Sequence, residues 1–114
     1  MIIELVDILI QPGKQEEFDK AIEYGVNSYI AKTPGFLGYR IGKSIESPER
    51  YVLQNYWATL ENHTVDFRSS QEFLQWRGVV GPFFVRPPLV EHLTILDEKV
   101  PVDSEPVLSV AQNP

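Results

Sequence analysis

The hydrophobic pattern of this chain changes its period at Pro12-Gly13, and this change limits the folds that the chain can adopt. Residues 2–10 form a run rich in β-branched side chains, which is typical of a strand closed by a turn. From residue 14 to residue 32, apolar side chains recur every three to four positions. This period predicts an amphipathic helix that ends before Pro34-Gly35. The chain therefore begins with a strand and a helix.

The rest of the chain adds a hairpin, a second helical region and a last strand. Residues 36–45 and 50–58 are extended runs on either side of a polar, proline-containing turn, which predicts a β-hairpin. Residues 59–80 have a helical pattern with a break near 68–70, and residues 89–96 form a last strand. The order βαββαβ predicts a ferredoxin-like α+β fold, in which a four-stranded antiparallel sheet carries its helices on one face.

The second helical region begins with an incomplete capping signal. Thr59 is a suitable N-cap residue, because its hydroxyl can accept a hydrogen bond from the first turn. A capping box needs Glu or Gln three residues later, and Asn62 occupies that position.

The composition of the chain excludes several classes of protein. Its 114 residues are the size of a single domain, and without cysteine it has no disulfides, thiolate chemistry or cysteine-bound zinc. Ten basic residues against 16 acidic ones give a net charge of -6, which argues against binding to nucleic acid. The N-terminus has no basic segment, and no apolar run is long enough to span a membrane. We therefore expect a cytoplasmic protein without a membrane partner.

The end of the chain differs from the domain that precedes it. Residues 97–114 contain four acids, one lysine and three prolines, with few hydrophobic residues. This composition predicts an extended acidic tail that follows a folded domain of residues 1–96.

Four short motifs follow one another along that domain. They are Pro12-Gly13-Lys14 with Glu17-Phe18, then Thr33-Pro34-Gly35-Phe36-Leu37-Gly38, then Arg50-Tyr51 leading to Trp57, and last Pro88-Leu89-Val90-Glu91. In this order they resemble the antibiotic biosynthesis monooxygenase family of dimeric α+β barrels. The resemblance implies a homodimer in which two sheets pack face to face, with a pocket in each subunit between sheet and helices. A partner subunit would cover the sheet face that the helices leave open.

Members of this family differ in their chemistry, and one branch degrades haem. Those members use a histidine of the second helical region as the iron ligand, an asparagine of the first strand and a tryptophan of the helix. By alignment, these positions hold Arg77, Val6 and either Asp66 or Phe67 in this chain. The chain therefore lacks the ligand for haem iron, and we do not expect it to degrade haem.

Another branch forms quinones in aromatic polyketide pathways. Its members use a tryptophan that ends the third strand, a tyrosine six residues later, an arginine twenty residues after the tryptophan and an asparagine four residues before it. Here Trp57 and Arg77 match, whereas His63 replaces the tyrosine and Leu53 replaces the asparagine. Asn55 lies on the same strand face as Leu53. The resemblance thus implies that His63, Arg77 and Trp57 are catalytic.

His63 and Arg77 have the chemistry that an oxygenase without a cofactor needs. A phenol or an anthrone must lose a proton before it can reduce dioxygen, so the protein must supply a base, a cation and a dry aromatic pocket. His63 titrates near neutrality and is the natural general base. Arg77 stays charged and can hold a phenolate or a developing peroxide. The alternative for both is an exposed position on a helix.

The pocket is expected between the strand of residues 50–58 and the helical region that follows it. Alternate positions of this strand share one face, and their aromatic side chains either wall a flat ligand or belong to the core. His92 in the last strand is either a second acid or base or a structural histidine. We predict that the substrate contacts Tyr51, Leu53, Asn55, Phe67, Phe73 and His92.

Two acids interrupt the first strand. Glu4 and Asp7 face opposite sides of the sheet, so they cannot act as a carboxylate pair. One of them is expected in the pocket or the dimer interface, where burial would raise its pKa.

We predict that the chemistry uses no cofactor. The two histidines are 29 residues apart without metal-ligand spacing, and no glycine-rich phosphate loop follows a strand. The resemblance to the family therefore implies a cofactor-independent monooxygenase that uses dioxygen on a hydrophobic aromatic, polyketide-like metabolite. The alternatives are a cyclase, dehydratase or decarboxylase with the same pocket, and a small-molecule binding module without activity.

Overall fold

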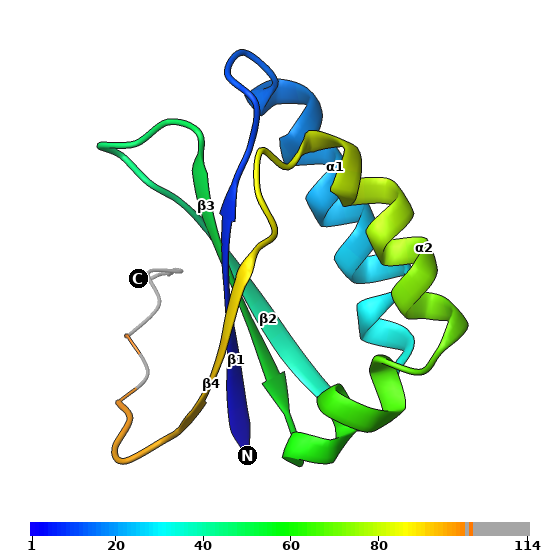
Figure 1. Ribbon diagram of the computed structural model, residues 1–114. Coiled ribbons are helices and arrows are strands. Elements are labelled where there is room, and N and C mark those ends of the chain that lie inside the picture. The colour runs from blue at the N-terminus through cyan, green and yellow to red at the C-terminus, as the bar shows by residue number, and fades with distance from the viewer. Residues whose placement is uncertain (100, 102–114) are drawn as a thin grey trace, which may run out of the picture.

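The computed structural model describes residues 1–99 and 101 and contains the predicted order of elements (Figure 1). The strands are β1 (Ile2–Leu9), β2 (Phe36–Lys43), β3 (Arg50–Trp57) and β4 (Leu89–Thr94), and the helices are α1 (Gln15–Ser28) and α2 (Gln71–Val80). Short helical turns at Ile30–Lys32, Asn62–Phe67 and Gly81–Phe83 join them. The predicted tail lies mostly outside the described residues. Among the residues that are described, no helix is long and apolar enough to cross a membrane.

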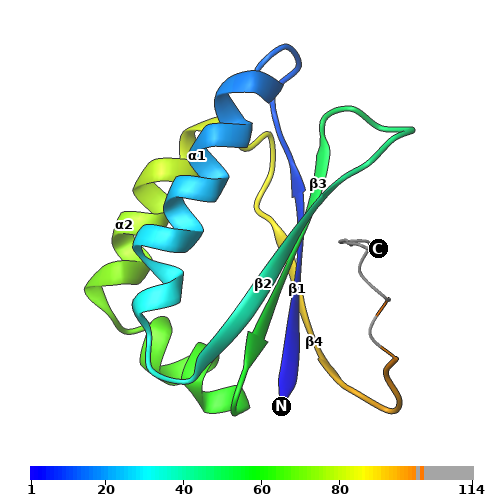
Figure 2. The ribbon, with the colours of Figure 1, turned by 180° about the vertical axis from the view of Figure 1, so that it is seen from behind.

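The four strands form one antiparallel sheet in the order β2-β3-β1-β4. Both α1 and α2 lie on one face of this sheet, as the two views in Figure 1 and Figure 2 show. The ferredoxin-like α+β fold is therefore confirmed. Because β1 lies between β3 and β4, Glu4 is paired with Asn55 on one side and with His92 on the other.

The core lies between the sheet and the helices. Side chains alternate along β1, so positions 4, 6, 8 and 10 are buried, whereas the residues between them are half-buried on the outer face. α1 meets the buried face with an apolar stripe of Phe18, Ile22 and Val26. Full burial of one such side chain contributes roughly 1.5–3 kcal/mol, so this layer holds the helices on the sheet.

The two helices approach each other closely at Gly25 of α1. A Cβ added at this position would lie 2.8 Å from Cε3 of Trp76 in α2. Glycine within a helix costs about 1 kcal/mol relative to alanine, but here its missing side chain makes room for the indole ring. Gly25 therefore sets the distance between the two helices.

The second helical region is broken at residues 68–70, as its pattern predicts. Its first part, Asn62–Phe67, is wound as a π-helix, and His63 and Phe67 are both buried in it. After the break, α2 begins at Gln71, and the hydroxyl of Ser70 caps it by accepting a hydrogen bond from a backbone N–H in the first turn.

The start of this region has a complete reciprocal cap in spite of its sequence. The hydroxyl of Thr59 accepts a hydrogen bond from the N–H of Asn62 at 3.2 Å, and Oδ1 of Asn62 accepts one from the N–H of Thr59 at 3.0 Å. Asn62 therefore takes the place of Glu or Gln in a capping box. Gly35 packs against Asn62 with a φ of +88°, where a side chain would be strained and would overlap the amide.

Candidate active site

A cavity of about 710 Å³ lies between the sheet and the helical layer. The sheet lines it with Glu4, Val6, Leu53, Asn55 and Val90. The helical layer adds Ile30, His63, Phe67, Arg68, Phe73, Trp76 and Arg77, and the segment before β4 adds Gly81, Phe84, Val85, Arg86, Pro87 and Pro88. A largely apolar lining with a few polar groups is typical of a site for a small organic molecule.

Glu4 is the centre of the polar group in this cavity. The residue is 5% exposed, and its Oε1 accepts hydrogen bonds from Nε1 of Trp57 at 2.9 Å and from Nδ2 of Asn55 at 3.2 Å. Its other oxygen, Oε2, lies 3.2 Å from Nε2 of His63. Trp57 and Asn55 both lie on β3, so the pairing of β1 with β3 fixes the position of the carboxyl group.

His63 extends this hydrogen-bonded chain to the edge of the sheet. It is 2% exposed, and its Nδ1 lies 2.8 Å from Nε2 of His92, which is half-buried on the edge strand β4. The rings of Trp57 and Phe67 are stacked with the imidazole at centroid distances of 5.7 Å and 6.0 Å. These aromatic neighbours fix the orientation of His63.

The chain of Glu4, His63 and His92 can hold its protons in two ways. If Glu4 is ionised, it accepts a hydrogen bond from Nε2–H of His63, and Nδ1 of His63 accepts one from His92. If Glu4 is protonated, it donates to Nε2 of His63, and Nδ1–H of His63 donates to His92. Both arrangements satisfy every group, so a proton can pass between Glu4 and His92 without movement of the heavy atoms.

Burial favours the neutral forms of Glu4 and His63. It raises the pKa of Glu4, against the opposing effects of the hydrogen bonds from Trp57 and Asn55 and of nearby positive charge. Burial also lowers the pKa of His63 to about 4, and the charges of Arg68 and His92 act in the same direction. His63 is therefore neutral at pH 7.

Two arginines line the cavity from the second helical region. Arg68 follows the π-helix, where its N–H donates to the carbonyl of His63, and its charge acts on both His63 and Glu4. Arg77 is in the last turn of α2, and its guanidinium lies 5.6 Å from the ring centre of Phe73. Both residues are exposed, so the cavity has cations on its solvent side.

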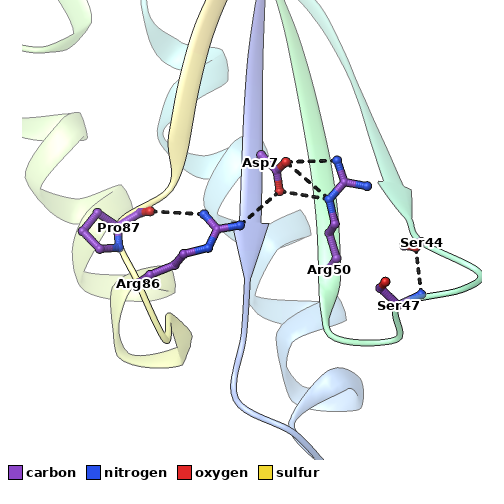
Figure 3. A network of polar contacts seen from close by, with 6 residues as sticks. All are labelled: Asp7, Ser44, Ser47, Arg50, Arg86 and Pro87. Atoms are coloured by element: carbon purple, nitrogen blue, oxygen red, sulfur yellow. Dashed lines mark hydrogen bonds and ion pairs between the residues drawn. The ribbon is translucent and has the colours of Figure 1, made fainter.

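Arg86 connects the cavity to the outer face of the sheet. Figure 3 shows its guanidinium turned toward Asp7 of β1, with 3.6 Å between Nη2 and Oδ1. Arg50 also binds Asp7, at 3.0 Å through its Nη2, and this contact is the main reason why the pKa of Asp7 is lowered. The N–H of Val85 donates to the carbonyl of Leu9 at 3.0 Å. The segment that closes one side of the cavity is thus anchored to β1.

Comparison with known families agrees with this fold. The profile of the family described as "Antibiotic biosynthesis monooxygenase" matches residues 1–79, more than half of the sequence. The chain belongs to this family. The resemblance that the four motifs carry is therefore confirmed, and the family indicates a general monooxygenase-like role.

Proteins similar to this chain in sequence or structure include some that are named for an activity and one that is uncharacterized. The uncharacterized protein YczJ of Bacillus subtilis (strain 168) is 32% identical over 92 residues, which are 81% of this chain and 96% of that protein. A solved structure named for the same family, from Bordetella bronchiseptica, is 38% identical with a TM-score of 0.76 and covers 87% of this chain and 96% of its own. The monooxygenase ActVA-Orf6 of Streptomyces coelicolor, in complex with nanaomycin D, shares the fold at 20% identity, with a TM-score of 0.73 over 89% of this chain and 92% of its own.

The structure brings most of the predicted site residues of this monooxygenase-family chain to one cavity. Those that line it are Leu53, Asn55, His63, Phe67, Phe73 and Arg77. Trp57 is fully buried and contacts Glu4 from behind the lining, and His92 is joined to the cavity through His63.

Tyr51 is placed differently from the prediction. It shares a face of β3 with the cavity residues, but it lies at the far end of the strand beside α1. There its hydroxyl donates to Asp19 at 2.5 Å, and its ring packs edge-on against Phe18 at 4.7 Å. Tyr51 therefore belongs to the core and to a separate shallow groove, because α1 covers this end of the sheet.

Sequence reasoning left the position of Glu4 open and missed Arg68 and Arg86. Glu4 and Asp7 do face opposite sides of the sheet, and Glu4 is the one in the cavity. Its parity with the apolar positions 6, 8 and 10 was the signal that could have identified it. No comparable signal existed for the two arginines, because they lie in segments without a regular period.

Metal ligands do not gather in the described part of the chain. No group of three His, Asp or Glu side chains is placed there to hold a metal ion. The independence of the chemistry from any cofactor stays a prediction.

Proposed function

We propose that this chain is a cofactor-independent monooxygenase that oxidises a hydrophobic aromatic metabolite of the phenol or anthrone type. The hydrogen-bonded group of Glu4, His63 and His92, which reaches into a cavity with aromatic and aliphatic walls, is the observation that carries this proposal. A positioned base beside a dry site for a flat ring is what the first step of such an oxidation requires.

The reaction begins with a proton transfer. Glu4 first passes its own proton through His63 to His92 at the edge of the sheet. The carboxylate so formed takes a proton from the substrate, which becomes a delocalised anion. Trp57 and Asn55 position the acceptor, because both donate to the oxygen of Glu4 that does not face His63. The positive charge of Arg77 in the cavity lining stabilises the negative charge of the anion.

The substrate then supplies the electrons for dioxygen. The anion passes one electron to dioxygen, and the two radicals combine to form a carbon–oxygen bond, which gives a peroxide. The peroxide anion takes back the proton from Glu4, and the resulting hydroperoxide breaks its O–O bond and loses water together with the remaining hydrogen on that carbon, which leaves a new carbonyl group. For an anthrone the sum is anthrone plus dioxygen to anthraquinone plus water, and each product receives one of the two atoms of dioxygen.

The outer face of the sheet supports the further proposal of a homodimer. Seven apolar side chains of β1, β3 and β4 lie on this face, away from the helices, namely Ile3, Leu5, Leu9, Val52, Tyr56, Leu89 and Leu93. Water contact with such a surface is unfavourable, and a second copy of the sheet would remove it. Sedimentation at micromolar concentration should give twice the mass of the 13.0 kDa chain, and a monomer would contradict the proposal.

Oxygen uptake with an anthrone tests the proposed activity. After subtraction of the uncatalysed autoxidation, the wild type should consume oxygen, and His63→Gln should lower turnover by ~10²-fold or more, the usual scale for a general base. Glu61→Gln is a matched control, because it is an exposed change in the same helical region. Product formation under anaerobic conditions would instead favour a cyclase or decarboxylase, and stoichiometric binding without turnover would favour a binding module.

A further inference from the structure

The cavity has the opposite charge from the chain as a whole. The net charge of the chain is -6, yet the cavity is lined by three arginines, one carboxyl group and no lysine or aspartate. That carboxyl group belongs to Glu4, and burial favours its neutral form. The field in the cavity therefore attracts an anion.

The three arginines of the cavity differ in their partners. Arg86 is paired with Asp7 at 3.6 Å. Within the part of the chain that the structure describes, no carboxyl group lies within ion-pair distance of Arg68 or Arg77. Arg77 lies over the ring of Phe73, at the border between the apolar wall and the solvent. These two guanidinium groups are therefore available to a ligand.

We propose that the substrate carries a permanently ionised carboxylate on its aromatic skeleton and that Arg68 and Arg77 bind this group. The inference rests on the proposed function and specifies the substrate class of the same site. A guanidinium offers a planar pair of donors that matches a carboxylate. With the carboxylate at this edge of the cavity, the aromatic skeleton packs on Phe67 and Phe73, and its reactive carbon is directed toward Glu4 and His63.

The charge of Arg68 gives such a ligand a second effect. Arg68 makes both Glu4 and His63 less basic, since its positive charge lowers the pKa of each. A carboxylate bound to Arg68 offsets this charge, so both groups become better proton acceptors when the substrate arrives. A neutral substrate has no such effect on the base.

Ligands that resist oxidation test the anion site separately from the chemistry. The probes are 2-naphthoate, the neutral 2-naphthamide and 2-naphthyl phosphate, each titrated into the full chain by calorimetry. We expect 2-naphthoate to bind at least about tenfold more tightly than 2-naphthamide, the scale of one charge-assisted hydrogen bond. A preference of the same size for the phosphate over the carboxylate would overturn the choice of carboxylate and assign the site to a phosphate ester.

Substitution of the arginines tests which side chains bind the anion. Arg68→Gln and Arg77→Gln should each reduce the preference for 2-naphthoate several-fold, and the double variant should abolish it. Arg40→Gln is the matched control, because it removes the same charge from an exposed position of β2 outside the cavity. Equal binding of naphthoate and naphthamide, binding of neither, or a preference that survives in the double variant would overturn the inference.

Oxygen uptake with a neutral anthrone, measured on the same preparations, separates this inference from the proposed function. Uptake without any preference for the anion would overturn the carboxylate site and leave the oxygenase intact. A preference for the anion without uptake of oxygen from any tested anthrone or anthrone carboxylate would overturn the oxygenase and leave the binding site intact.

Discussion

Glu4 and Asp7 lie three residues apart on opposite faces of β1, and the pKa values of their carboxyl groups are shifted in opposite directions. Glu4 is buried among side chains that can share a proton with it, and its pKa is raised by burial. Asp7 is on the outer face, where Arg50 and Arg86 bind it and its pKa is lowered. The difference shows that neighbouring groups and access to water, and not the residue type, decide whether an acid exchanges protons or stays charged as an anchor.

The largest difference between the two acids is expected in catalysis. Glu4→Gln removes the proton acceptor and should lower oxygen-dependent turnover by ~10²-fold or more. Asp7→Asn should cost far less, because this side chain is on the opposite face from the cavity. Steady-state oxygen uptake measures both effects. Equal losses of turnover in the two variants would contradict the assignment of proton exchange to Glu4 and of an anchoring role to Asp7.

The second difference is expected in the dependence of stability on pH. The pKa of His63 is about 4 when folded and about 6.5 when unfolded, so the unfolded state binds more protons between these values. Stability should therefore fall on acidification from pH 6.5 to 4, by up to about 1.4 kcal/mol for each pH unit. Glu4 acts in the opposite direction, because its contribution is full below its usual pKa of 4.5 and is lost as the pH rises through the higher folded value.

Substitutions separate the contributions of Glu4 and His63 to the pH dependence, and the pH range separates the contribution of Asp7. Arg68 and His92 face both buried groups and stay in place in each variant. Urea unfolding between pH 4 and 7 should show that Glu4→Gln loses stability on acidification more steeply than the wild type, whereas His63→Gln loses less or gains. The folded pKa of Asp7 is lowered, so its contribution is lost only below about pH 4. Identical profiles for the wild type and His63→Gln would contradict the burial of a neutral imidazole.

The smallest difference concerns the donors that hold each acid. Trp57→Phe removes the N–H that donates to Glu4 together with part of a fully buried ring, and it should reduce the free energy of unfolding by about 1–2 kcal/mol. Arg50→Gln removes a donor to Asp7 and should have a smaller effect, because water screens an exposed ion pair. Urea unfolding at pH 7 compares them directly, and a larger loss for Arg50→Gln would reverse the order that burial implies.

The fold was predictable because the period of the hydrophobic pattern is a local property of the sequence. The switches between periods two and 3.6 correctly predicted the order of six elements and the break near residues 68–70. The ends of the elements depend on individual hydrogen bonds, such as the cap in which Asn62 replaces Glu or Gln. Such substitutes are visible only when the backbone is in place.

The candidate site was only partly predictable, because it depends on the register between strands. The motif pattern identified His63 and Arg77, but the contact of Glu4 with His63 and the link to His92 require β1 to pair with β3 and β4 in one register. The strand alternation placed Tyr51 on the correct face, yet it could not show that α1 covers that end of the sheet. Alternation determines the face of a side chain and not its position along the face.

Gly25 has a consequence for how members of this family diverge. Trp76 fills the notch that Gly25 leaves in α1, and the same indole forms a wall of the cavity. Any larger residue at position 25 must push the indole aside and so move that wall, although no residue that meets a ligand has changed. Selection for a new substrate can therefore act through a position hidden behind the cavity, and a survey of specificity confined to the lining residues would overlook it.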